Sequence, residues 1–211
     1  MPKNIFMGFI VPLSILLPII VFLFKYKLAG KGLKYLFYFL ILAALINLAA
    51  LFLVRMGMRN LPLLHLYTVV ETVFFLAYFH SIFENENIKK VIKVIMFAFP
   101  ALCVVNFIFI QDLFTFNTYT RPLEALIITV ICLLYLYKSS ASENWLGSPI
   151  NWVNMGILLY FPAASIIFIL ANYFTFVGGD GEMSRSIWNL HAILVLAMYL
   201  IWTKAFSLIK K

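Results

Sequence analysis

The hydrophobic positions of this chain fall into seven long blocks separated by short polar connections. Each block is close to the roughly 20 apolar residues that a helix needs to cross a bilayer. The connections are too short to hold a soluble domain. We therefore predict an all-α membrane protein in which residues 1–211 form a single bundle of seven transmembrane helices: Ile5–Phe24, Leu33–Val54, Leu61–Phe83, Ile88–Ile110, Pro122–Tyr137, Trp152–Phe176 and Ile187–Phe206.

Composition agrees with this pattern. Of the 211 residues, 64% are hydrophobic, 18% are aromatic and only 11% are charged, which is far more apolar than a soluble domain. A net charge of +8 would suggest nucleic acid as the partner of a soluble protein, but here the basic residues cluster at the ends of the blocks. We expect no nucleic-acid partner, contact with membrane lipid, and a location in the bacterial cytoplasmic membrane.

The basic residues also predict how the chain is threaded. If the N-terminus is outside, eleven basic residues lie on the cytoplasmic side: Lys25, Lys27, Lys31, Lys34, Lys89, Lys90, Lys93, Lys138, Lys204, Lys210 and Lys211. Five lie on the opposite side: Lys3, Arg55, Arg59, Arg121 and Arg185. Cytoplasmic loops carry the excess of Lys and Arg, so the count favours the N-terminus out and the C-terminus in.

The third block carries three ionisable residues, and such residues within a span are costly and therefore candidates for function. At 100° per residue, Tyr67 and Glu71 share one helix face. His65 lies about 120° from Glu71 and roughly 9 Å nearer the outer surface, which makes it a rim residue. His80 lies about 180° from Glu71, near the cytoplasmic end. Glu71 is therefore the expected centre of a site.

Two helix starts carry polar groups. Asn87 is the expected N-cap of the fourth helix. The fifth helix opens with Arg121, Pro122 and Glu124. Proline suits a first turn and a carboxylate there complements the helix dipole, so ordinary helix initiation is one interpretation. In the other, Arg121 and Glu124 face inward at the mouth of the bundle.

The predicted threading places most polar residues of the spans in the outer half of the bundle. They are His65, Tyr67, Glu71, Arg121, Glu124 and His191, joined by Asn47, Asn106 and Asn172. An outward-facing ligand-binding pocket would account for this arrangement. Independent hydrogen bonds between helices would account for the asparagines, but Glu71 still needs a partner such as Arg121 or His191.

We consider three functions. A non-enzymatic receptor, sensor or small-ligand binder is favoured, with a small-molecule or lipid ligand, no cofactor, and output through a separate signalling partner chain. The alternative is a metal-dependent intramembrane lipid hydrolase, in which His65, Glu71 and His191 bind zinc and Glu124 acts as base. A transporter or proton-translocating protein ranks third, because no paired repeats or glycine-interrupted half-helices are present.

Short motifs add one resemblance. The spacing H-x-Y-x-x-x-E of His65, Tyr67 and Glu71, together with W-x-x-H at Trp188 and His191, resembles small bacterial seven-helix membrane proteins of uncharacterised activity. That resemblance implies a fold but no activity. Seven-helix ceramidase-like hydrolases look similar in helix count, but the last span contains no H-x-x-x-H.

Overall fold

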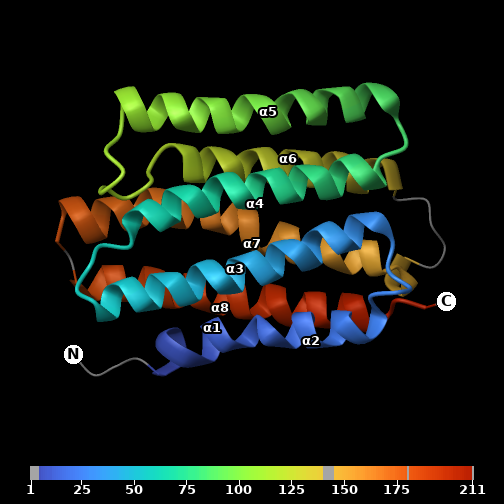
Figure 1. Cartoon of the computed structure of the whole chain (residues 1–211), viewed down its shortest axis with the longest axis horizontal. Helices are drawn as coiled ribbons and strands as arrows, with labels where there is room; N and C mark the ends of the chain where they lie inside the picture. The colour runs from blue at the N-terminus through green and yellow to red at the C-terminus, as the bar shows by residue number, and fades with distance from the viewer. Residues whose placement is uncertain (1–4, 140–144, 180, 211) are drawn as a thin grey trace. The chain divides into compact units, whose positions relative to one another are not determined.

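The computed structural model describes residues 5–139, 145–179 and 181–210, without the side chains of residues 172, 176 and 177. Within this part of the chain every regular element is helical (Figure 1). The α-helices are α1 (Val11–Ser14), α2 (Leu16–Lys25), α3 (Lys31–Arg55), α4 (Leu61–Ile82), α5 (Glu86–Phe109), α6 (Thr120–Ser139), α7 (Pro149–Ala171) and α8 (Gly181–Ser207). Three short elements are η1 (Phe6–Ile10), η2 (Trp145–Gly147) and η3 (Asn172–Val177).

Among the described residues, seven helical segments are long and apolar enough to cross a membrane: Phe6–Lys25, Lys31–Arg55, Leu61–Ile82, Glu86–Phe109, Thr120–Ser139, Pro149–Thr175 and Gly181–Ser207. The prediction of an all-α chain with seven such helices is therefore confirmed. The fifth of these segments, α6, is longer than the expected Pro122–Tyr137, because its first turn begins before the proline.

The start of α5 differs from the prediction in its capping residue. The Asn85 side-chain oxygen accepts hydrogen bonds from the backbone N–H groups of Asn87 (3.0 Å) and Ile88 (3.1 Å). Asn85 is thus the N-cap, and Asn87 lies inside the helix. The prediction of Asn87 was wrong because the helix begins at Glu86, earlier than the apolar block.

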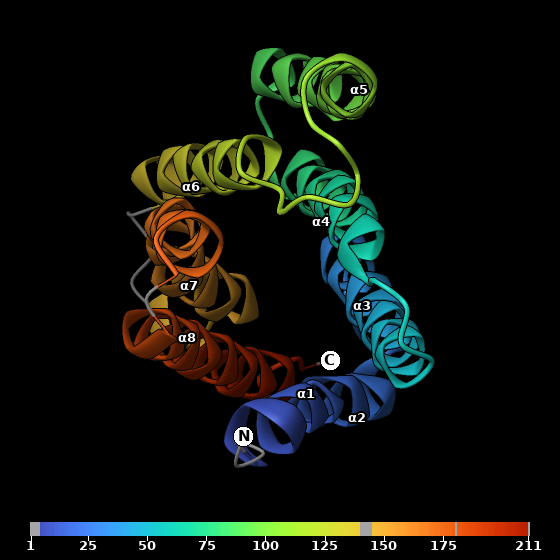
Figure 2. The same ribbon diagram turned by 90° about the vertical axis from the view of Figure 1, so that its left-hand side faces the viewer.

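Residues 30–124 form one compact unit, which we call the α3–α5 unit. Within it, α4 contacts both α3 and α5 (Figure 2). A Cβ atom added at Gly32 would lie 2.5 Å from the Ser81 hydroxyl oxygen and 2.9 Å from an Ile82 methyl carbon. A larger residue at Gly32 would therefore force a shift of side chains where the start of α3 meets the end of α4. The unit also contains the first residues of α6, which end with Glu124.

The second compact unit, the α7–α8 unit, comprises residues 1–29 and 125–211. In it, α8 contacts both α2 and α7. The rings of Phe22 and Phe206 meet edge to face with their centroids 4.8 Å apart. Trp202 donates a hydrogen bond to the Val153 carbonyl (3.1 Å). A Cβ at Gly156 would lie 2.7 Å from the same indole nitrogen, so a glycine is needed there.

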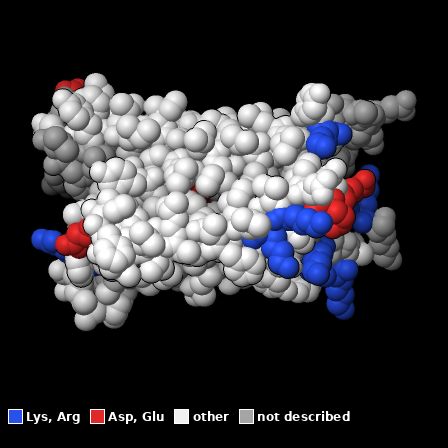
Figure 3. Space-filling model, turned by 90° about the horizontal axis from the view of Figure 1, so that it is seen from above, with Lys and Arg blue, Asp and Glu red and all other residues white. Residues whose placement is uncertain are grey.

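Charged side chains gather at the helix ends. In the α3–α5 unit, the end at which α3 and α5 begin carries five lysines: Lys31, Lys34, Lys89, Lys90 and Lys93. The opposite end carries the exposed Arg55 and Arg59. Figure 3 shows Lys and Arg at both ends of the visible face, with more of them at one end, while the middle of that face is free of them. This is the distribution expected of helices whose middle parts lie in hydrocarbon.

Candidate functional site: a buried charge triad

Glu71, Arg121 and Glu124 meet inside the α3–α5 unit. Their exposed fractions are 1%, 4% and 0%, so all three charged groups are buried. The Arg121 Nη1 atom donates hydrogen bonds to Glu71 Oε2 and to Glu124 Oε2, the latter over 2.6 Å. One guanidinium therefore joins two carboxylates from two helices. We call these three residues the triad.

Tyr67 completes the surroundings of Glu71. Its hydroxyl donates a hydrogen bond to Glu71 Oε1 over 3.2 Å, and its ring lies 5.2 Å from the Arg121 guanidinium carbon. The predicted common face of Tyr67 and Glu71 is thus confirmed. Both oxygens of Glu71 have hydrogen-bond donors, and the Tyr67 ring adds a cation–π contact with the arginine.

The start of α6 holds two members of the triad in place. Arg121 and Glu124 are three residues apart, so they project from the same side of the helix. Asn117, just before the helix, accepts hydrogen bonds from the Thr120 hydroxyl (2.7 Å) and the Arg121 backbone N–H (3.3 Å). The inward-facing interpretation of Arg121 and Glu124 is therefore the one that the structure supports.

The triad contains two carboxyl groups and one guanidinium. Two carboxylates share one guanidinium, which leaves one carboxylate in excess. Glu124 Oε1 is buried and lacks a hydrogen-bond partner within the described structure. The hydroxyl of the nearby Thr72 donates a hydrogen bond to the Thr68 carbonyl oxygen (2.8 Å). An uncompensated buried charge costs several kcal/mol, so the carboxyl group of Glu124 favours either its neutral form or a cationic partner at Oε1.

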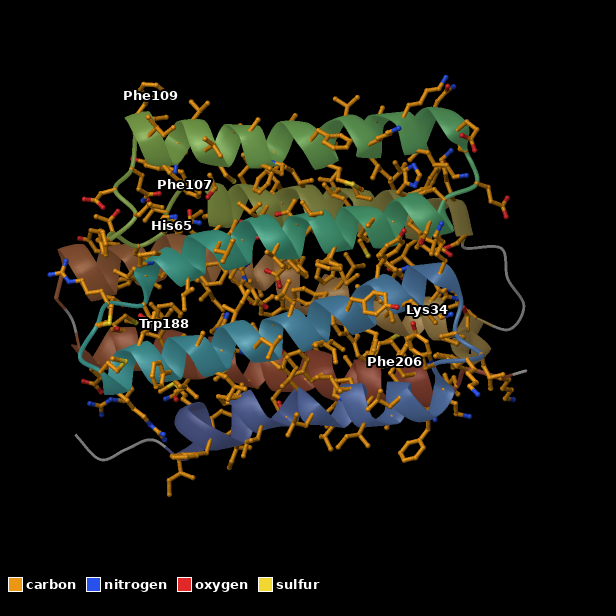
Figure 4. All side chains as sticks on the ribbon, viewed as in Figure 1. Lys34, His65, Phe107, Phe109, Trp188 and Phe206 are labelled. Carbon is orange, nitrogen blue, oxygen red and sulfur yellow. The ribbon has the colours of Figure 1, made fainter. Side chains whose placement is uncertain are left out.

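The loop between α5 and α6 covers the beginning of α4. His65 Nε2 lies 3.0 Å from the Thr115 carbonyl oxygen, and the Asn117 amide donates to the Thr68 hydroxyl over 3.1 Å. The His65 ring also packs edge to face on Phe107, with centroids 4.7 Å apart; Figure 4 labels both residues at this end of the unit. His65 is 1% exposed, so it lies beneath the loop and does not form an open rim.

A second polar network holds the loop itself. The Gln111 amide donates to the Phe116 carbonyl (2.6 Å) and to the Thr118 hydroxyl (2.9 Å), and Asn106 donates to Gln111 over 3.3 Å. Asn106 is buried, and its hydrogen bond joins this loop network. These bonds join the end of α5 to the loop that leads into Arg121.

Sequence reasoning missed the roles of Asn117, Gln111 and Thr68. The segment from Leu113 to Thr120 reads as an interfacial loop, and its content of Asn and Thr was the available signal. The partner of Asn117 on α4 is 49 residues away, so no local spacing reveals the contact.

Three further predicted residues lie elsewhere. His191 belongs to the α7–α8 unit, where its Nε2 lies 3.0 Å from the Tyr160 hydroxyl and its ring contacts Phe168 and Trp188. Asn47 is exposed on α3. Asn172 begins η3, and its side chain is outside the described part.

No group of three or more His, Cys, Asp or Glu side chains that could hold a metal ion occurs in the part of the chain that the structure describes. The residues proposed for zinc have other neighbours. Glu71 is bound to a guanidinium, and His65 to a backbone carbonyl.

No protein-family model, curated protein or solved structure matches the chain.

Proposed function

We propose that this chain is an integral membrane protein, N-terminus out and C-terminus in, that binds a small ligand carrying a positively charged nitrogen at the triad. It acts as a receptor or sensor and catalyses no reaction. Its location is the bacterial cytoplasmic membrane, and a separate partner chain carries its output. The distribution of lysines at the helix ends supports the orientation.

The observation that carries this proposal is the excess carboxylate. Glu71 has a donor on each oxygen, whereas Glu124 binds Arg121 through one oxygen only. A ligand ammonium group placed at Glu124 Oε1 would balance the charge and supply the absent hydrogen bond. Charge-assisted hydrogen bonds of this kind are about twice as strong as neutral ones, which makes an amine a better ligand than an alcohol of the same shape.

Access to this atom depends on the loop before α6. Asn117 in this loop donates a hydrogen bond to the Thr68 hydroxyl of α4. The loop leads directly into Arg121, so movement of the loop would move the guanidinium as well. Ligand binding at the triad would thereby change the position of a segment at the membrane surface. A partner chain could bind differently to the segment in its two positions.

The test compares purified wild-type protein in lipid nanodiscs with the variants E71Q, E124Q and E86Q. Glu86 is an exposed carboxylate paired with Lys89, so E86Q removes the same charge far from the triad. Thermal unfolding is followed with a panel of primary alkylamines, each matched by the neutral alcohol of the same carbon skeleton.

An amine at 100 times its Kd should stabilise the wild type and E86Q by about 2.7 kcal/mol. The matched alcohol should give little stabilisation, and E124Q should lose the response to the amine. Equal responses to amine and alcohol, or an amine response retained by both E71Q and E124Q, would remove the triad as the binding site.

A further inference from the structure

A seam of seven residues runs along α3 at alternating spacings of four and three. Its members are Leu33, Phe37, Leu40, Ala44, Asn47, Leu51 and Val54. At 100° per residue they stay within about 100° of one another, which is the arrangement of a and d positions in a coiled coil. We call this set the α3 seam.

Burial changes midway along the α3 seam. Leu33, Phe37 and Leu40 are 6%, 5% and 0% exposed. Beyond Ala44, Asn47 is exposed, Leu51 is 46% exposed and Val54 is 56% exposed. The first half of the α3 seam is therefore covered within the chain, while the second half is left uncovered.

Asn47 is the polar residue of the otherwise apolar α3 seam. It lies sixteen residues after Lys31 and eight before Arg55, about 24 Å and 12 Å along the helix. Both distances place it within a hydrocarbon core of about 30 Å. None of the residues described in the structure hydrogen-bonds to its side chain. A polar group left unpaired in lipid costs free energy, so Asn47 favours any arrangement that supplies a partner.

We propose that the uncovered half of the α3 seam is a dimer interface, and that the partner is a second copy of this chain. Two copies in one membrane share an orientation, so their α3 helices run parallel and a two-fold axis brings Asn47 opposite Asn47. An amide carries both a donor and an acceptor, so the two side chains can bond to each other in both directions. A single Asn at a seam position is known to fix register and oligomeric state.

Neighbouring residues suit this contact. Ala44, one turn before Asn47, is small enough to let two helices approach closely. Leu51 and Val54 continue the same seam with large apolar side chains. The exposed Arg55 lies at the end of the helix, where the repulsion between two copies is screened by salt within about 10 Å. This inference involves none of the residues of the triad and does not depend on the proposed function.

Cysteine crosslinking provides the first test. Asn47→Cys is compared with Leu45→Cys, because Leu45 is 56% exposed and lies about 160° around the helix from Asn47. Cys103 and Cys132 are buried, and wild-type protein oxidised in parallel measures their contribution. N47C should form a disulfide-linked dimer in native membranes and L45C should not. Equal crosslinking of both variants, or none of N47C, would overturn the proposal.

Dilution in liposomes provides the second test and needs no new cysteine. The dimer fraction is counted by single-molecule photobleaching of labelled protein across a range of protein-to-lipid ratios. Asn47→Leu should weaken dimerisation about three- to thirty-fold, whereas Asn47→Gln, which keeps the amide, should retain most of it. A monomeric wild type, or unchanged dimerisation of N47L, would contradict the proposed interface.

Discussion

Glutamine at position 124 should make the protein more stable, although it removes a partner of Arg121. Glu124 is fully buried, and its second oxygen lacks a hydrogen-bond partner in the described structure. In Glu124→Gln the side-chain oxygen still accepts a hydrogen bond from Arg121. The new amide can donate to the oxygen of the nearby Thr72 hydroxyl, because that hydroxyl donates its own hydrogen to the Thr68 carbonyl. The variant therefore balances the charge without losing the hydrogen bond.

The size of the effect follows from these contacts. Relief of one uncompensated buried charge should contribute about 1–3 kcal/mol to the free energy of unfolding, at the low end of the several kcal/mol that such a charge costs. For a chain of 150–250 residues, 1 kcal/mol corresponds to about 2–4 °C in Tm. Glu124→Gln should thus raise Tm by roughly 2–12 °C. Glu71→Gln removes the same charge, but its single amide oxygen replaces two carboxylate oxygens that accept from Tyr67 and Arg121. Its free energy of unfolding should therefore be about 1–3 kcal/mol lower than that of Glu124→Gln.

The change in stability can be measured for each unit separately, because each unit contains one native cysteine. Both are buried, so a thiol-reactive fluorescent dye labels them only on unfolding. With Cys132→Ala as background, Cys103 reports on the α3–α5 unit alone. Arg121→Met, which leaves two carboxylates without a cation, is the reference for a broken triad and should lose about 3–5 kcal/mol. If Glu124→Gln destabilises as much as Arg121→Met, the charge excess inferred for the triad is wrong.

Three further substitutions test other parts of the structure. Asn117→Ala should lower the free energy of unfolding by about 1–2 kcal/mol in the same dye assay, because α6 loses its capping side chain. His65→Phe keeps an aromatic ring but loses the contact with the Thr115 carbonyl, so limited proteolysis should cleave the loop before α6 faster than in the wild type; an unchanged rate would show that this contact does not hold the loop. Gly156→Ala should destabilise the α7–α8 unit, because the added methyl would lie 2.7 Å from the Trp202 indole nitrogen, and a Cys103→Ala background allows Cys132 to report it.

The helices of this protein could be predicted because their determinants are local. Apolar blocks of about 20 residues predict spans from length and composition alone. The common face of Tyr67 and Glu71 follows from helix geometry, and a hydrogen bond between them confirms it. Even the need of Glu71 for a cationic partner follows from the cost of an unpaired charge at that depth.

Which partner Glu71 takes was decided by tertiary structure. Arg121 and His191 were equally available to sequence reasoning, and the loop before α6 brings Arg121 to Glu71 across 50 positions of the chain. The position of His65 beneath that loop, and the exposure of Asn47 on α3, depend in the same way on which faces neighbouring segments cover. Helical periodicity assigns residues to a face, but the choice of the face that is buried is made by packing between segments distant in sequence.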